Sequence, residues 1–172
     1  VILTPVESTA DSHLERTTKL WQSVGALVSS MSVQEHDQIL AATSHLPHFL
    51  AYSLVDTLAA MNEKTDIFRY AAGGFRDFTR IAASDPIMWR DIAIANKDAV
   101  IHVMDEMMEN LTALRASIEA KDKQALTQIF TRSREARNHF GSMLESNKTD
   151  TGLQSPMNEK IINYIVSPGG NA

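Results

Sequence analysis

The chain has 172 residues, 44% of them hydrophobic and 22% charged, which is enough for one domain with a hydrophobic core. Its net charge of −5 gives no basic surface for nucleic acids or anionic membranes, so we expect neither as a partner. The absence of cysteine excludes disulfides and thiolate chemistry and fits a reducing cytoplasm. No apolar run approaches the roughly 18 residues of a membrane-spanning helix. The first residues, VILTP, show neither an initiator methionine nor a signal-like segment, so we expect the middle of a longer protein.

The first half of the chain alternates one short strand-like run with long helical patterns. Residues 1–3 are apolar and suit the last strand of a preceding domain. Residues 8–11 offer side-chain caps for a helix that we expect to reach about residue 31. Residues 33–61 form a second long apolar-rich stretch.

The second half continues as helices. A glycine pair at residues 73–74 interrupts the pattern, and residues 75–83 can form a short helix. The triplet SDP at residues 84–86 is typical of a helix start, with a side-chain cap before a proline, and this helix should reach about Asn96.

Two long amphipathic helices are predicted next, at about residues 98–120 and 123–146. Their short connection predicts an antiparallel hairpin. The methionine-rich run at residues 102–111 has the spacing of a core or a subunit interface. Residues 149–157 indicate a linker, and residues 161–166 alternate like a strand. The sequence thus predicts an all-α domain with a short strand-like tail.

A proline lies between two histidines in the segment SHLPHFL. Inside a helix Pro47 would cost about 3 kcal/mol, because it lacks an N–H group and clashes with the preceding turn. We therefore expect two helices with a break near residues 43–44, where Ser44 or His45 caps the second helix and Pro47 occupies its first turn.

Asp37 and the histidines suggest a first candidate site. Asp37 precedes His48 by eleven residues, which is about 20° from a whole number of turns in a continuous helix. The carboxylate could therefore fix the tautomer or the charge of His48. A polar stripe at a helix end is the plainer alternative. A metal site that uses His36, His45, His48 or Asp37 is another, although two histidines three residues apart without a clear third ligand are weak evidence for zinc.

The segment GGFRDFTRIAASDPIMW, at residues 73–89, suggests a second site. Arg76 and Arg80 lie one helical turn apart, and Asp77 lies three residues before Arg80. A guanidinium group binds a carboxylate through two parallel hydrogen bonds, and glycines allow backbone to approach a ligand closely. The alternative is a solvated helical turn with internal ion pairs.

Both segments, HDQILAATSHLPHFLAYSLVDTL and YAAGGFRDFTRIAASDPIMWRDI, closely resemble the C-terminal helical domain of the prephenate dehydrogenase family, which includes arogenate and cyclohexadienyl dehydrogenases. The resemblance covers most of residues 1–145. It implies an all-α, multi-helix dimerisation domain of the 6-phosphogluconate-dehydrogenase C-terminal type. It also implies an oxidoreductase of tyrosine biosynthesis that oxidatively decarboxylates prephenate to 4-hydroxyphenylpyruvate, or arogenate to tyrosine.

The cofactor and the catalytic base are implied to lie outside this chain. In the family, NAD or NADP is bound mainly by an N-terminal Rossmann domain that also carries a histidine base, and the chain contains no G-x-G-x-x-G phosphate loop. We therefore expect no catalytic residue and no metal ligand here, and no activity of the chain by itself. Homodimerisation is implied as well. The preference for prephenate or arogenate, the choice between NAD and NADP, and feedback by tyrosine stay open.

The resemblance also implies a substrate pocket. Its binding residues would be His45, His48, Gly73, Arg80, Met88 and Trp89. Within this set, Arg80 would bind a carboxylate of the substrate, and His45 would lie at the edge of the pocket. Asp37 and Asp77 would support the pocket through a charged network with His48 and Arg80.

The tail MNEKIINYIVSPGG resembles the opening of 5-enolpyruvylshikimate-3-phosphate synthase, which implies a bifunctional cytoplasmic enzyme. The expected domains are the end of the Rossmann domain at residues 1–6, the helical domain at 7–147, a linker at 148–158 and the start of the synthase at 159–172. The alternative is a free-standing helical interaction module without a catalytic role.

Overall fold

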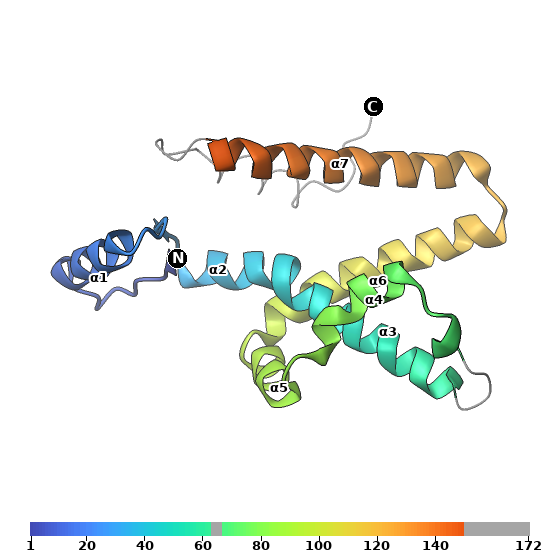
Figure 1. Ribbon diagram of the computed structural model, residues 1–172, viewed down its shortest axis with the longest axis horizontal. Coiled ribbons are helices and arrows are strands. Elements are labelled where there is room, and N and C mark those ends of the chain that lie inside the picture. The colour runs from blue at the N-terminus through green and yellow to red at the C-terminus, as the bar shows by residue number, and fades with distance from the viewer. Residues whose placement is uncertain (63–66, 150–172) are drawn as a thin grey trace. The chain divides into compact units, whose positions relative to one another are not determined.

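The computed structural model describes residues 1–62 and 67–149 (Figure 1). The described residues form α1 (Asp11–Ser23), α2 (Val33–Leu40), α3 (Leu46–Asn62), α4 (Gly73–Thr79), α5 (Pro86–Ala95), α6 (Lys97–Glu119) and α7 (Lys123–Thr149). A π-helical turn, η1 (Ala41–His45), and two 3₁₀ turns, η2 (Phe68–Tyr70) and η3 (Arg80–Ala83), complete the helical elements. The all-α prediction is confirmed. The predicted linker lies outside the described residues except for residues 148–149, which belong to α7, and the strand-like tail lies wholly outside them. Two compact units divide the chain, residues 1–112 and 113–172.

The strand predicted at residues 1–3 is present as β1 (Ile2–Leu3), which pairs in parallel with β2 (Ser29–Ser30). The prediction that the first helix reaches residue 31 is wrong, because α1 ends at Ser23. Gly25 has φ +83°, a backbone conformation that favours glycine and turns the chain back toward β1. The predicted side-chain cap is also absent: the N-cap of α1 is Ala10, which has no side-chain capping bond.

The long stretch after β2 is wound as α2, η1 and α3 in direct succession. Ser32 and Glu35 form a capping box at the start of α2, with Glu35 N donating to Ser32 Oγ over 3.1 Å and Ser32 N to Glu35 Oε2 over 3.0 Å. In η1 the Leu46 N–H group reaches back five residues to the Ala41 carbonyl. Pro47 lies in the first turn of α3, as predicted. The predicted break with a cap is wrong, since the backbone stays helical through Leu46.

The next elements follow the local sequence signals. The glycine pair starts α4 instead of interrupting it, and the predicted helix at residues 75–83 is divided between α4 and η3. The start of α5 is confirmed: Asp85 Oδ1 accepts hydrogen bonds of 2.8 Å from the N–H groups of both Ile87 and Met88, and Pro86 is the first helical residue.

The two long helices are confirmed as α6 and α7. Between them Lys121 adopts φ 54°, Asp122 N donates to Ser117 O over 2.9 Å, and Asp122 Oδ1 caps α7 by accepting from Ala125 N over 2.9 Å. The tight connection that the sequence predicted is therefore present. Antiparallel packing of the two helices stays a prediction.

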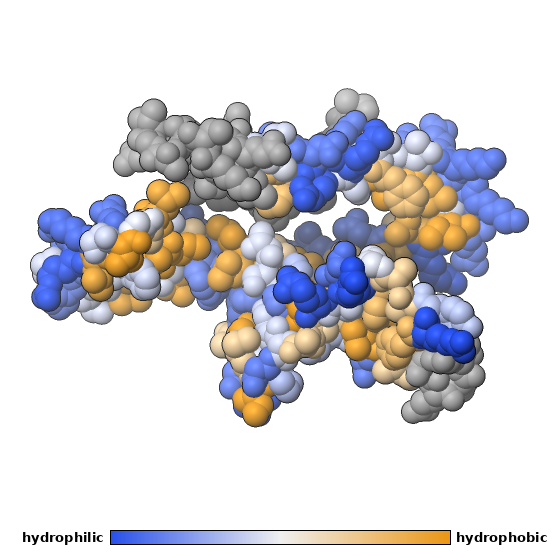
Figure 2. Space-filling model, in the orientation of Figure 1, coloured by the Kyte–Doolittle hydropathy of each residue, from blue (hydrophilic) through white to orange (hydrophobic). Residues whose placement is uncertain are grey.

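Little apolar surface is buried. Among the described residues the buried hydrophobic side chains are Ala41, Ala51, Trp89 and Val100. Figure 2 shows apolar side chains at the surface over α1, and α6 exposes an apolar stripe as well. The exposed apolar residues of α1, the segment after it and α6 include Leu20, Trp21, Val24, Leu27, Ile101, Met104, Met108 and Leu111. No helix among the described residues is long and apolar enough to cross a membrane.

Candidate functional site

An aromatic cluster joins η1, α3 and α5. The His48 ring stacks on the Trp89 indole with 3.7 Å between ring centroids and 21° between planes. The rings of His45 and Phe49 meet the same indole edge-on, at 6.0 and 5.8 Å. Trp89 is only 7% exposed, so the cluster is the part of the core that fixes α5 against α3.

The His48 ring is oriented by η1. Its Nδ1 lies 2.9 Å from the Ser44 carbonyl oxygen. Because a carbonyl only accepts hydrogen bonds, Nδ1 must carry a hydrogen, and a neutral ring then has Nε2 as an acceptor. The hydrogen bond to η1 therefore orients a histidine whose Nε2 has no hydrogen-bond partner among residues 1–62 and 67–149.

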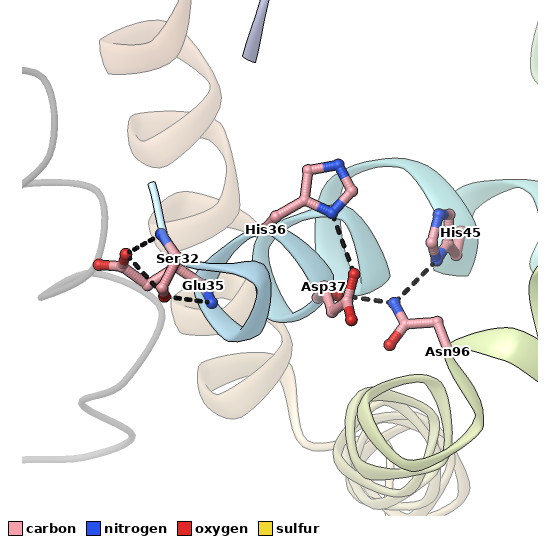
Figure 3. Close-up of polar contacts among 6 residues, drawn as sticks. All are labelled: Ser32, Glu35, His36, Asp37, His45 and Asn96. Carbon is pink, nitrogen blue, oxygen red and sulfur yellow. Dashed lines mark hydrogen bonds and ion pairs between the residues drawn. The ribbon is translucent and has the colours of Figure 1, made fainter. Parts of the chain in front are cut away.

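The His45 ring, which meets Trp89 edge-on, also contacts the side chain of Asn96 (Figure 3). Asn96 Nδ2 lies 2.8 Å from the Asp37 backbone oxygen and 3.3 Å from His45 Nδ1. Burial lowers the pKa of His45, and nearby His36 and His48 lower it further, whereas the Asp37 carboxylate acts in the opposite direction. These influences favour a neutral His45.

The four expected network residues are not joined to one another among the described residues. Asp37 Oδ1 pairs with His36 Nδ1 at 3.0 Å, and Asp77 Oδ1 with Arg76 Nε at 3.5 Å. Asp77 and Arg76 are both largely exposed, so their ion pair contributes little to stability. Asp37 does not reach His48 because η1 changes the rotation between α2 and α3, whereas the expectation assumed a continuous α-helix.

Arg80 lies at the start of η3, is exposed and has no ion-pair or hydrogen-bond partner for its guanidinium group among the described residues. η3 packs against α3, the helix that carries His48. The hydroxyl of Tyr52 on α3 donates a 2.7 Å hydrogen bond to the Ser84 carbonyl, directly after η3. The unpaired guanidinium group of Arg80 thus lies on η3, a segment that is packed against α3, the helix that carries His48.

The remaining expected pocket residues lie at the surface. Gly73 has open space where a Cβ would stand, and Met88 is half exposed beside Trp89 in the sequence. No group of three potential metal-ligating side chains occurs among residues 1–62 and 67–149. The structure therefore places His45, His48 and Trp89 together, and leaves Gly73, Arg80 and Met88 exposed to solvent.

Sequence reasoning missed three residues of this region: Phe49, Tyr52 and Asn96. Phe49 and Tyr52 belong to an apolar helical pattern, and nothing in that pattern singles them out. Tyr52 lies one turn after His48, however, so it could have been placed on the same helical face as His48. Asn96 was noticed only as the end of a helix. No local signal distinguishes an asparagine that ends a helix from one that bridges two other elements.

Comparisons with known proteins agree with this architecture. Residues 32–132 match the family described as "Prephenate dehydrogenase, dimerization domain". The chain is 40% identical over 139 residues to the cyclohexadienyl dehydrogenase of Zymomonas mobilis, covering 80% of this chain and 47% of that protein. It is 39% identical over 137 residues to the prephenate dehydrogenase of Bacillus subtilis, covering 79% and 37%.

The chain also resembles a crystal structure of prephenate dehydrogenase from Aquifex aeolicus in complex with hydroxyphenyl propionate and NAD+. The two superpose with a TM-score of 0.76 at 39% identity, and the match covers 81% of this chain and 49% of that one. The chain thus spans less than half the length of these relatives. The matched family region contains η1, the aromatic cluster and Arg80. The chain belongs to the prephenate dehydrogenase dimerization-domain family.

Proposed function

We propose that this chain is the substrate-binding and dimerisation domain of an NAD(P)-dependent prephenate or arogenate dehydrogenase. The observation that carries the proposal is the stacked His48–Trp89 pair, with an unpaired Arg80 on a segment packed against the same helix, inside the matched family region. The relative from Aquifex aeolicus binds hydroxyphenyl propionate, which carries one ring and one carboxylate. A ligand of that chemistry needs an arginine and a few oriented hydrogen-bonding groups.

The chain would contribute binding and orientation. Prephenate carries two carboxylates, and the exposed Arg80 guanidinium can bind one of them through two parallel hydrogen bonds. His48 Nε2, the ring nitrogen not bonded to Ser44, is left for a hydroxyl or carboxylate of the substrate. Holding the substrate in one orientation lowers the entropic part of the barrier.

The residues of this chain do not form a binding site for NAD(P). The 172 residues contain no G-x-G-x-x-G phosphate loop, so we assign NAD(P) binding and the catalytic base to a separate Rossmann domain. We therefore expect these residues alone to be inactive. The choice between NAD and NADP and feedback by tyrosine stay open, and a cytoplasmic location stays a prediction.

Homodimerisation is part of the proposal. The exposed positions Ile101, Met104, Met108 and Leu111 recur every three or four residues and lie on one face of α6. An apolar stripe of this kind is typical of a face covered by another subunit. Light scattering of the full-length protein at micromolar concentration should give the mass of a dimer, and a monomer would contradict this part.

The tail supports one more proposal, a fused 5-enolpyruvylshikimate-3-phosphate synthase. Only the sequence resemblance of residues 157–170 supports it, and these residues lie outside the described structure. The full-length protein should then also transfer an enolpyruvyl group to shikimate 3-phosphate, and the absence of this activity would contradict the fusion.

The main test is an activity assay of the full-length protein with prephenate and with arogenate, each with NAD and with NADP. Arg80→Ala should raise KM by about tenfold or more, since a charge-assisted hydrogen bond contributes about 1.5–3 kcal/mol. Arg132→Ala is the matched control, because Arg132 is also exposed and lies on α7. Inactivity of the full-length protein with both substrates and both cofactors would contradict the proposal and favour a helical interaction module.

A further inference from the structure

We propose that Asn96 is a positioning residue that fixes the His45 ring in a single tautomer, with its hydrogen on Nε2. His45 then presents one uncharged N–H donor on the edge of the ring away from Asn96 (Figure 3). The use of this donor by a substrate oxygen rests on the proposed function. The tautomer itself follows from the hydrogen bonds alone.

The hydrogen-bond logic leaves one arrangement. The atom of Asn96 that lies 2.8 Å from the Asp37 backbone oxygen must be the amide nitrogen, because a carbonyl oxygen only accepts. The same nitrogen lies 3.3 Å from His45 Nδ1 and has a second hydrogen to donate. His45 Nδ1 is therefore the acceptor, and the hydrogen of a neutral ring is on Nε2.

Asn96 is well anchored for this task. Its backbone N–H donates to Ile92 O in the last turn of α5, and its carbonyl accepts from Val100 N in the first turn of α6, each over 3.0 Å. Between two helix ends its main chain has little freedom. Its side-chain amide donates to the Asp37 carbonyl. That carbonyl and the Gln38 carbonyl both accept from the Ala41 N–H group at the start of η1. One amide thus joins the α5–α6 junction to the helix that precedes the π turn.

The surroundings of His45 favour a neutral ring, because burial lowers its pKa more than the Asp37 carboxylate raises it. The charged and titratable groups that act on it are the Asp37 carboxylate, whose Oδ1 is engaged by His36, together with the rings of His36 and His48. On the α5 side its neighbours are the Trp89 indole and the Asn96 amide, and neither carries a charge. Protonation of Nδ1 would place an N–H group against the Asn96 amide hydrogens and break this bond.

An alternative is that Asn96 only ties two elements together, and the Asn96→Asp substitution separates the two roles. It keeps the size and shape of the side chain but replaces both donors with acceptors. A carboxylate at this position would accept from His45 Nδ1–H, so the hydrogen should move to Nδ1 or the ring should become protonated. Asn110→Asp is the matched control, because Asn110 is exposed on α6 and donates only within its own helix.

The experiment is long-range ¹H–¹⁵N spectroscopy of the full-length protein labelled in its histidine rings, near neutral pH and without substrate. Loss of one ring signal in His45→Gln assigns the residue. The expected result is a neutral His45 with hydrogen on Nε2 in the wild type and in Asn110→Asp, and hydrogen on Nδ1 in Asn96→Asp. A wild-type ring that is protonated or carries its hydrogen on Nδ1 overturns the proposal, even when every variant fails to fold.

Kinetics then test the use of the donor. In Asn96→Ala the KM for prephenate should rise about two- to tenfold, which corresponds to one neutral hydrogen bond, while kcat stays within about twofold. An unchanged KM in both Asn96 variants overturns the role in substrate binding. Since the spectra need no substrate, failure of the tautomer assignment is distinguishable from failure of the proposed dehydrogenase activity.

Discussion

Replacing Trp89 with alanine should destabilise the helical domain strongly, because its indole is the largest buried side chain among the described residues. The side chain is 7% exposed, and burial of about 200 Å² of apolar area at about 25 cal/mol/Å² stabilises the fold by about 5 kcal/mol. Its Nε1–H group is buried without a hydrogen-bond partner among the described residues, which costs about 1–3 kcal/mol in the wild type. The substitution removes both contributions, so we expect a net loss of about 2–4 kcal/mol.

Urea unfolding of the full-length protein, followed by far-ultraviolet circular dichroism, measures this loss. Trp21→Ala is the matched control, because Trp21 is 42% exposed on α1 and should change the free energy of unfolding by less than about 1 kcal/mol. Trp89→Phe should fall between the two, since it keeps a ring under His48 and removes the unpaired N–H group. If Trp89→Ala and Trp21→Ala are equally mild, the aromatic cluster is not the core of this domain.

Three further substitutions can be compared in the same unfolding assay. Ser32→Ala breaks the capping box of α2 and should lower the free energy of unfolding by about 1 kcal/mol. The control Ser133→Ala, on the exposed face of α7, should lower it by less than about 0.5 kcal/mol. Equal effects would contradict a stabilising role of the cap. Tyr52→Phe leaves the Ser84 carbonyl without its donor and should cost about 1–2 kcal/mol, and no loss would show that this bond is replaced by water. Burial lowers the pKa of His45 below the ordinary histidine value of about 6.5, so in acid the unfolded chain binds a proton more readily than the folded one. The contribution of His45 to the free energy of unfolding is complete above about pH 6.5 and is lost on acidification. His45→Gln should therefore reduce the fall in the free energy of unfolding between about pH 7.5 and pH 5.5. An identical fall in the wild type and the variant would contradict the lowered pKa of His45.

The helices themselves were predictable because their signals are local. Amphipathic periodicity gave α6 and α7 to within a few residues, and the Ser-Asp-Pro triplet gave the start of α5. The family motifs also identified His45, His48 and Trp89, which the structure brings into one cluster. In each case the residues that determine the feature are neighbours in sequence or part of a recognisable motif.

The features that were mispredicted depend on contacts between distant residues. The early end of α1 follows from pairing of β2 with β1, and one glycine in an apolar stretch did not reveal it. The expected face shared by Asp37 and His48 assumed uniform α-helical geometry, which η1 does not follow. The bridge from Asn96 to Asp37 and His45 spans 59 and 51 residues, a separation for which a single sequence carries no signal.

The π turn also gives single-residue insertions and deletions a particular meaning in this region. An α-helix advances about 100° per residue, so removing one residue from residues 41–45 and restoring uniform winding would rotate α3 by about that angle relative to α2. His48 would then leave the Trp89 face, and Pro47 would lie inside an uninterrupted helix, where it is costly. When homologous sequences are aligned, a one-residue gap at this point therefore marks a different arrangement of the aromatic cluster, although a gap of the same length in most surface loops is nearly neutral.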